Sequence, residues 1–76
     1  MISKRKNVAQ LVMERARTAF EKSGLSLEEL GQRMGYDGDS ARKSAWQFLN
    51  KTVDPRLSML DKFSDALNIR LNELLK

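Results

Sequence analysis

Apolar residues recur at helical spacing in five separate blocks of this chain, and turn-forming residues stand between the blocks. The first block runs from Val8 to Ser23, where apolar side chains return every three or four positions. Asn7 is expected to be the N-cap of this helix, and Gly24 supplies the left-handed residue that commonly ends one. No block has the alternating pattern of a strand. The pattern therefore predicts a chain built from helices.

A second helix is predicted by signals at both of its ends. Ser26 and Glu29 form an S-x-x-E capping box, in which two reciprocal hydrogen bonds satisfy amides at a helix start, and Gly35 closes the helix. Its buried side is expected to consist of Leu27, Leu30 and Met34. Gly31 stands in the middle of this helix, where glycine costs about 1 kcal/mol relative to alanine. Another helix is therefore expected to pack closely against that face.

A third helix is predicted to start near Ser40, after the turn-forming segment 35–40, with Asp39 or Ser40 as its cap. At about 100° per residue, one arc of this helix holds Ala41, Ala45, Phe48 and Leu49. The opposite arc holds Ser40, Lys43, Gln47 and Asn50, with Ser44 and Trp46 on its flanks and Arg42 nearer the core edge. This helix is thus expected to turn polar and basic side chains outward.

Asp54 and Pro55 predict the start of a fourth helix, because proline lacks an amide that would be unsatisfied at the first helical position. Its buried stripe is expected to be Leu57, Leu60, Phe63 and Leu67, with Asn68 in the position that follows the helix. Ile69, Leu71, Leu74 and Leu75 predict one last short helix. The predicted fold class is all-α: a compact five-helix orthogonal bundle over residues 8–76, preceded by a flexible basic arm over residues 1–7.

Composition narrows the functions that this chain can serve. It has 76 residues, no cysteine and no histidine, so metal sites, redox thiols and most nucleophile–base pairs are disfavoured. We therefore expect neither an enzyme nor a cofactor, and the lack of cysteine makes the cytoplasm the expected compartment. No apolar run approaches the length of about 20 residues that crosses a bilayer. The net charge of +4 is a hint of polyanion binding.

The order of landmarks along the chain is more specific than its composition. The landmarks are Gly24-Leu25-Ser26, Glu28-Glu29-Leu30, Met34-Gly35, Pro55-Arg56-Leu57-Ser58-Met59-Leu60, Ala66-Leu67-Asn68-Ile69 and Leu71-Asn72-Glu73-Leu74-Leu75. This order resembles the Cro/CI-type helix-turn-helix family, also called XRE-type or lambda-repressor-like, and the resemblance covers nearly the whole chain from the first helix onward. It implies a sequence-specific DNA-binding transcriptional regulator, expected to be a repressor, whose third helix enters the major groove.

The chain also departs from the family pattern. The turn after Gly35 is about four residues longer than is usual in the family, and Leu27 stands where the family often has a phosphate-contacting glutamine. Arg70 replaces the serine or threonine that usually caps the last helix. Phe20 and Leu49 occupy the places of a common arginine–glutamate pair, and we predict that these two apolar side chains touch.

The resemblance implies a set of DNA-binding residues on the third helix and just after it. Gln47 suits an adenine edge, while Arg42 and Lys43 suit guanine acceptors or nearby phosphates. The full set is Ser40, Arg42, Lys43, Ser44, Trp46, Gln47, Asn50, Lys51, Thr52 and Arg56. The implied partners are double-stranded DNA and a second copy of the chain, as a homodimer on a pseudo-palindromic site. No membrane and no small-molecule substrate are implied.

Several of these residues have a second interpretation. Lys43 and Gln47 also suit an ordinary solvated face, and Ser40 suits a helix cap. Trp46 suits either packing against the long turn or Tyr36, or contact with a thymine methyl group or the DNA backbone.

The whole bundle also has a second interpretation, as a protein-interaction module or antitoxin that binds a protein partner through a surface formed by Leu71, Leu74 and Leu75. At the N-terminus, Lys4, Arg5 and Lys6 are either an arm for the minor groove or a solvated terminus.

Overall fold

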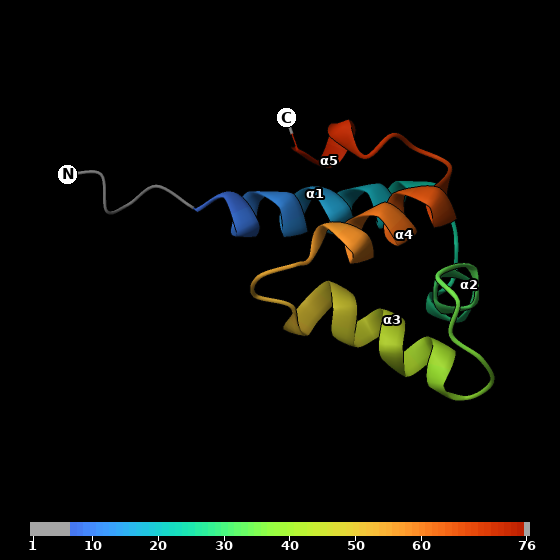
Figure 1. The fold of residues 1–76 in the computed structure, drawn as a ribbon. Coiled ribbons are helices and arrows are strands. Elements are labelled where there is room, and N and C mark those ends of the chain that lie inside the picture. The colour runs from blue at the N-terminus through green and yellow to red at the C-terminus, as the bar shows by residue number, and fades with distance from the viewer. Residues whose placement is uncertain (1–6, 76) are drawn as a thin grey trace.

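Helices make up most of the chain in the computed structural model, which describes residues 7–75 (Figure 1). Within that range there are five: α1 (Val8–Ser23), α2 (Leu27–Arg33), α3 (Ser40–Lys51), α4 (Leu57–Leu67) and α5 (Asn72–Leu75). No strand occurs among these described residues. The all-α prediction and the predicted number of helices are therefore confirmed for this part of the chain. The proposed basic arm, residues 1–6 of the segment 1–7, lies outside it.

The helices are arranged around the pair α1 and α4, which lie side by side across the molecule (Figure 1). The short helix α5 packs against α1, and α3 lies on the opposite side of the pair. Figure 1 shows α2 almost end-on beside the N-terminal end of α3, so the two helix axes cross steeply. The contact between α2 and α3 is the most extensive of all the helix pairs described. This contact sets the direction of α3.

Local sequence signals fix where the first two helices begin. Asn7 accepts a hydrogen bond from the amide of Gln10 at 2.8 Å, and the Gln10 side chain accepts one in return from the Asn7 amide at 3.1 Å. Ser26 and Glu29 form the same reciprocal pair, at 3.1 and 3.0 Å. Both boxes satisfy amides that have no partner within the helix. The predicted caps of α1 and α2 are confirmed.

Residues in the left-handed backbone region fix where α2 and α4 end. Gly35 has a φ of 102° and Asn68 a φ of 58°. Beyond each of them the next amide bonds back to a helical carbonyl at 2.9 Å, from Tyr36 to Gly31 and from Ile69 to Ser64. This is the Schellman arrangement, which satisfies carbonyls at a helix end and turns the chain sharply. The predicted roles of Gly35 and Asn68 are confirmed.

The predicted start of α3 is confirmed, and that of α4 is wrong by two residues. Helix α4 begins at Leu57, two residues later than Asp54 and Pro55 predict, and the extended Arg56 precedes it. Pro55 is half-buried and lines a hollow between α3 and α4, so tertiary packing places it in the loop. Helix α3 begins at Ser40 with Asp39 in the N-cap position, but Asp39 forms no side-chain capping bond, and the Ser40 hydroxyl donates to the Asp37 carbonyl at 2.7 Å.

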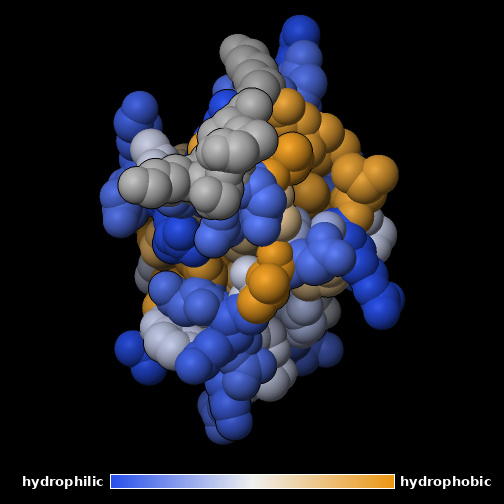
Figure 2. Space-filling model, turned by 90° about the vertical axis from the view of Figure 1, so that its left-hand side faces the viewer, coloured by the Kyte–Doolittle hydropathy of each residue, from blue (hydrophilic) through white to orange (hydrophobic). Residues whose placement is uncertain are grey.

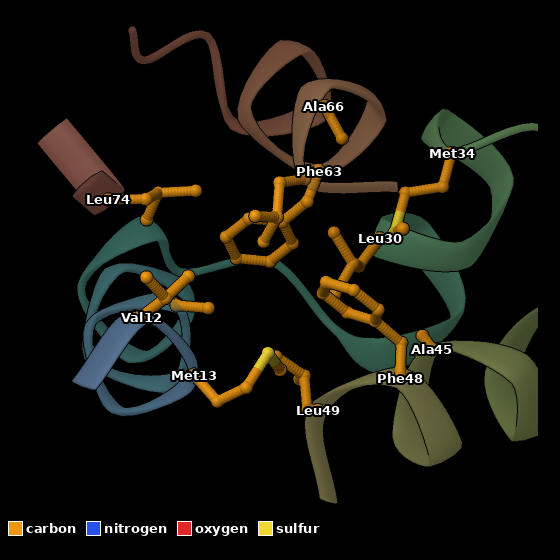
Figure 3. Packing of buried hydrophobic residues seen from close by; sticks show 12 residues of the cluster. Val12, Met13, Leu30, Met34, Ala45, Phe48, Leu49, Phe63, Ala66 and Leu74 are labelled. Atoms are coloured by element: carbon orange, nitrogen blue, oxygen red, sulfur yellow. The ribbon is translucent and has the colours of Figure 1, made fainter. Parts of the chain in front are cut away.

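The core forms around Phe63 of α4, which is fully buried (Figure 3). Its ring lies 5.4 Å from that of Phe48 between centroids, with a tilt of 37°. Figure 3 shows buried side chains reaching this centre from all five helices, among them Val12, Leu30 and Leu74. Burying one such side chain contributes roughly 1.5–3 kcal/mol. The core therefore joins α3 to the rest of the bundle through Phe48.

The predicted partners Phe20 and Leu49 belong to the same apolar cluster. Leu49 is buried within it, and Phe20 is a partly buried side chain packed against it. Their direct contact remains a prediction. One turn before Phe20, the guanidinium of Arg17 donates to the backbone carbonyl of Leu49 at 2.9 Å. A charged side chain of α1 therefore contacts the C-terminal end of α3, where it donates a hydrogen bond to a backbone carbonyl.

Arg17 is one of three arginines that bond to the C-terminal end of another helix. Arg33 of α2 donates to the Ala66 carbonyl of α4 at 3.1 Å, and Arg15 of α1 donates to the Leu74 carbonyl of α5 at 3.3 Å. Each carbonyl lies among the last four of its helix, which have no partner within that helix. The negative end of the helix dipole also favours a cation there. We call these three contacts the arginine ties.

Replacing Arg17 with methionine keeps most of the side-chain volume but leaves the Leu49 carbonyl without its charged donor. We expect Arg17→Met to lower the free energy of unfolding by about 1 kcal/mol, because hydrogen bonds to charged groups contribute about 1.5–3 kcal/mol and this one is only partly buried. Urea unfolding measures the change. Arg70→Met, at an exposed position after α4, is the control and should change stability by less than about 0.5 kcal/mol. Equal losses in the two variants would contradict the role given to Arg17.

Gly31 is the point of closest approach between α2 and α3. A Cβ atom built at Gly31 would overlap the carbonyl oxygen of Ala41 and would lie 2.9 Å from its Cα. Those contacts are with backbone, which cannot move aside as a flexible side chain would. Both residues are buried. The expectation that a helix packs closely against the face of Gly31 is confirmed.

The substitution Gly31→Ala tests this close contact, because the change in stability expected here is opposite to the usual effect of replacing glycine with alanine in a helix. In an exposed helix interior it stabilises by about 1 kcal/mol. Here the methyl group would force α3 away from α2, and we expect a loss of about 1–3 kcal/mol in the free energy of unfolding, measured with urea. Gln32→Ala, at the next and exposed position, should be close to neutral. A Gly31→Ala variant that is as stable as the parent would show that the two backbones are not in contact.

Candidate functional site

The outer face of α3, formed by Ser40, Lys43, Gln47 and Asn50, is exposed along its whole length. The opposite arc is buried, as the sequence predicts, through Ala41, Ala45, Phe48 and Leu49. On the flanks, Trp46 is 44% exposed and Ser44 is half-buried. Arg42 is exposed, although its position on the helix wheel placed it near the core edge. The outer face therefore carries donors, acceptors and a cation with no apolar side chain among them.

The two ends of the molecule differ in character (Figure 2). The lower part of this view, where α3 lies, is mostly hydrophilic, while the upper part, near α1 and α5, holds a hydrophobic patch. The exposed apolar residues that α1 and α5 contribute are Val8, Leu11 and Leu75. The hydrophilic surface of α3 is thus a local property of that helix and is not shared by the whole molecule.

A hollow lies between α3 and the start of α4, and we call it the α3–α4 hollow. It brings together five of the ten candidate residues: Ser44, Gln47, Lys51, Thr52 and Arg56. Tyr36, Phe48, Asp54, Pro55 and Met59 complete its lining. Two cations, two hydroxyl groups and an amide, from α3 and from the loop that follows it, therefore converge on one side of the outer face.

A second hollow lies on the other flank of α3, beside the start of α2, and we call it the α2–α3 hollow. Its lining consists of Leu27, Asp39, Arg42, Lys43 and Trp46. Three of these were predicted from the sequence as DNA-binding residues. Trp46 lies here, whereas Tyr36 lines the α3–α4 hollow. At 44% exposure Trp46 is not a core residue, but Asp39 of the long turn lines the same hollow, and packing of Trp46 against the turn or Tyr36 stays a prediction.

Some candidate side chains already have partners within the protein. The Asn50 amide donates to the Trp46 carbonyl at 3.0 Å, one turn earlier in the same helix. The Ser40 hydroxyl is bonded to the turn before α3, as described above. The Lys51 ammonium lies 5.7 Å from the centroid of the Trp46 ring, within the range of a cation–π contact. Ser40 and Asn50 also line neither hollow, so these two are the least available of the ten.

Positive charge is concentrated around α3. Arg42 and Lys43 flank one side, and Lys51 and Arg56 flank the other. A single acid lines each hollow, Asp39 in one and Asp54 in the other. Ammonium and guanidinium groups on an exposed surface attract anions from a distance of about 8–10 Å in physiological salt. The two flanks therefore form a cationic frame around the outer face, which we also call the ridge and which itself carries Lys43.

Seven residues that line the hollows were not among the ten candidates from the sequence: Leu27, Tyr36, Asp39, Phe48, Asp54, Pro55 and Met59. Tyr36 and Asp39 lie in the long turn, for which no local pattern predicts a direction. Leu27 had a usable signal, because it stands where the family that the sequence resembles often contacts phosphate. Its apolar side chain lines the same hollow as Trp46, and this depends on the crossing of α2 and α3.

Metal sites and membrane spans were also sought among residues 7–75. No group of three or more histidine, cysteine, aspartate or glutamate side chains is placed to hold a metal ion. In the same range no helix combines the length and the apolar character that crossing a membrane requires.

Comparison with protein-family models, with curated proteins and with solved structures finds no match to this chain. The functional assignment therefore depends on the geometry described above and on the order of sequence landmarks.

The direction of α3 depends on α2, and the N-terminus of α2 depends on Glu29. Its carboxylate accepts a hydrogen bond from the Ser26 amide, and the Ser26 backbone and hydroxyl together lower the pKa of Glu29 below its usual value of 4.5. A folded-state pKa below the unfolded value means that this bond contributes its full stability above pH 4.5. The contribution is lost as the pH falls through the folded-state pKa.

We expect an NMR titration of the Glu29 carboxyl to give a pKa below 4.5, and Ser26→Ala to return it toward that value. Glu29→Gln removes the titrating group, so its loss of stability relative to the parent should be largest near neutral pH and should shrink below pH 4.5. Glu28→Gln, at the neighbouring exposed position, is the matched control. A Glu29 pKa at or above 4.5 in the folded protein would rule out the proposed contribution.

Proposed function

We propose that this protein is a sequence-specific DNA-binding regulator of the Cro/CI helix-turn-helix type, acting as a repressor and reading the major groove with α3. The observation that carries the proposal is the exposed outer face of α3, which offers base-reading side chains between two cationic flanks. The lambda-repressor-like arrangement of the helices belongs to the same proposal. It is supported by the landmark order and by the steep crossing of α2 and α3 at Gly31.

The dimensions of α3 suit a duplex groove. Twelve residues make a helix about 18 Å long, and the major groove of B-DNA, about 12 Å wide, admits one α-helix. With the outer face at the floor of the groove, its two flanks would approach the two phosphate backbones. The cations on those flanks then supply the attraction for phosphate, while the polar ridge between them meets the base edges.

Individual side chains divide between these two roles. Lys43 and Gln47 lie on the ridge, where an ammonium group suits guanine acceptors and an amide suits an adenine edge. Lys51, Thr52 and Arg56 share the α3–α4 hollow and suit the phosphates of one strand. The remaining residues of the proposed interface are Ser40, Arg42, Ser44, Trp46 and Asn50. Of these, Ser40 and Asn50 contribute least, because their side chains already bond to backbone carbonyls.

The regulator is proposed to bind a pseudo-palindromic site as a homodimer, an expectation that comes from the family resemblance. A second candidate function is binding to a protein partner, as in an antitoxin. Of the three residues predicted to form a surface for such a partner, Leu74 is buried in the core and Leu71 is half-buried, so only Leu75 is exposed. The exposed apolar residues that favour a protein partner are Leu75 on α5 and Val8 and Leu11 on α1. This patch lies away from α3, so a protein partner there would not compete with DNA for the outer face (Figure 2).

Measuring the affinity for DNA at several salt concentrations tests the proposal. Each phosphate contact should contribute about −0.9 to the slope of log affinity against log salt. Lys51→Ala should weaken binding to all sequences alike and reduce the slope by about 1. Lys43→Ala and Gln47→Ala should instead each reduce the preference for the selected site over random DNA, by about 1–3 kcal/mol.

Lys62→Ala is the matched control, since Lys62 is exposed on α4 and lines neither hollow. It should leave the sequence preference unchanged. Binding that is independent of salt, or a preference that survives both ridge substitutions, would overturn the assignment of α3 as the reading helix. A protein that binds no duplex, but whose apolar patch takes up a protein, would support the second candidate.

A further inference from the structure

The α2–α3 hollow differs from a simple anion site. Two apolar side chains, Leu27 and Trp46, line it together with Arg42, Lys43 and the carboxylate of Asp39. A carboxylate repels phosphate, and large apolar side chains give phosphate no hydrogen bonds. The lining instead matches a base edge, which offers hydrogen-bonding groups and, in one base, an apolar group. Thymine is that base, because it presents the O4 acceptor and a C5-methyl group in the major groove.

The position of the hollow favours contact with bases. Lys43 belongs both to the outer face of α3 and to the lining of the hollow, so the hollow opens directly beside the ridge that would enter the groove. Trp46 is 44% exposed, which leaves a large part of its indole ring accessible. Leu27, on the first turn of α2, is half-buried and forms part of the same surface.

We propose that Leu27 and Trp46 form a subsite for the C5-methyl group of a thymine in the bound site. This inference rests on the proposed function of α3. Thymine fits better than 5-methylcytosine, because its O4 atom accepts hydrogen bonds from the two neighbouring cations, Arg42 and Lys43. The amino group of 5-methylcytosine is a donor and would face those cations unfavourably, with Asp39 as its single acceptor in the lining.

The test uses the full chain and a duplex site selected from a random library. Each thymine of that site is replaced in turn by deoxyuridine, which lacks only the C5-methyl group. We expect one position in each half-site at which this change weakens binding by about fourfold, the equivalent of about 0.8 kcal/mol for one buried methylene-sized group. Trp46→Ala should bind the thymine and uracil forms equally. Trp46→Phe, which keeps an aromatic surface, should retain part of the discrimination.

Lys62→Ala is again the control, because Lys62 is exposed on α4 and lines neither hollow. It should keep the full preference for thymine over uracil. Salt-dependent, sequence-specific binding that ignores every thymine methyl group would overturn the subsite and leave the proposed function standing. A preference for 5-methylcytosine over cytosine at one position, without discrimination of thymine from uracil, would overturn the choice of thymine. Failure to bind any duplex would overturn both proposals.

Discussion

The close approach of α2 and α3 at Gly31 is the constraint on which the rest of the surface depends. A side chain at this position would overlap the backbone of Ala41, so only glycine allows the two helices to meet at this distance. The neighbouring contacts are made by small residues too, since Ala41 and Ala45 are fully buried. Because these contacts are short and involve backbone, they leave little freedom in the direction of α3. That direction decides which side chains lie on the outer face and which line the hollows.

One of the arginine ties, that of Arg17, completes this hold on α3. The N-terminal part of α3 packs against α2 at Gly31, and the Leu49 carbonyl near its C-terminus receives a hydrogen bond from Arg17 of α1. Phe48, next to Leu49, packs against Phe63 of α4 at the centre of the core. Helix α3 is therefore held near both of its ends, by contacts with three different helices. A short helix in isolation is marginally stable in water. These tertiary contacts therefore stabilise α3 and fix its orientation.

Local chemistry made much of the fold predictable from the sequence. Capping boxes at Asn7 and Ser26 and left-handed residues at Gly35 and Asn68 all act within a few residues, so pattern reading finds them. The buried arc of α3 followed from helical periodicity alone. The start of α4 was missed because Pro55 packs into the hollow beside α3, a long-range contact that a local capping rule does not contain.

The candidate site was less predictable for the same reason. Its outward residues follow from the helix wheel, but the arginine ties join positions 32, 33 and 59 residues apart, and nothing near each arginine marks its partner. That Leu27 and Trp46 line one hollow likewise depends on how two helices cross. The sequence left Trp46 with packing against the long turn or Tyr36, or with contact to DNA, and the fold places it beside Leu27 and Asp39.

The residues of α3 that pack against other helices and those that face solvent lie on different sides of the helix. Its buried arc and the Leu49 carbonyl make the contacts with the other helices described above, whereas Lys43 and Gln47 are exposed and do not belong to the core cluster. The side chains at these two positions can therefore be replaced without loss of the contacts that hold α3 in place. A combinatorial library that varies them together should consist largely of folded members, so that altered target preferences could be selected without re-engineering the scaffold.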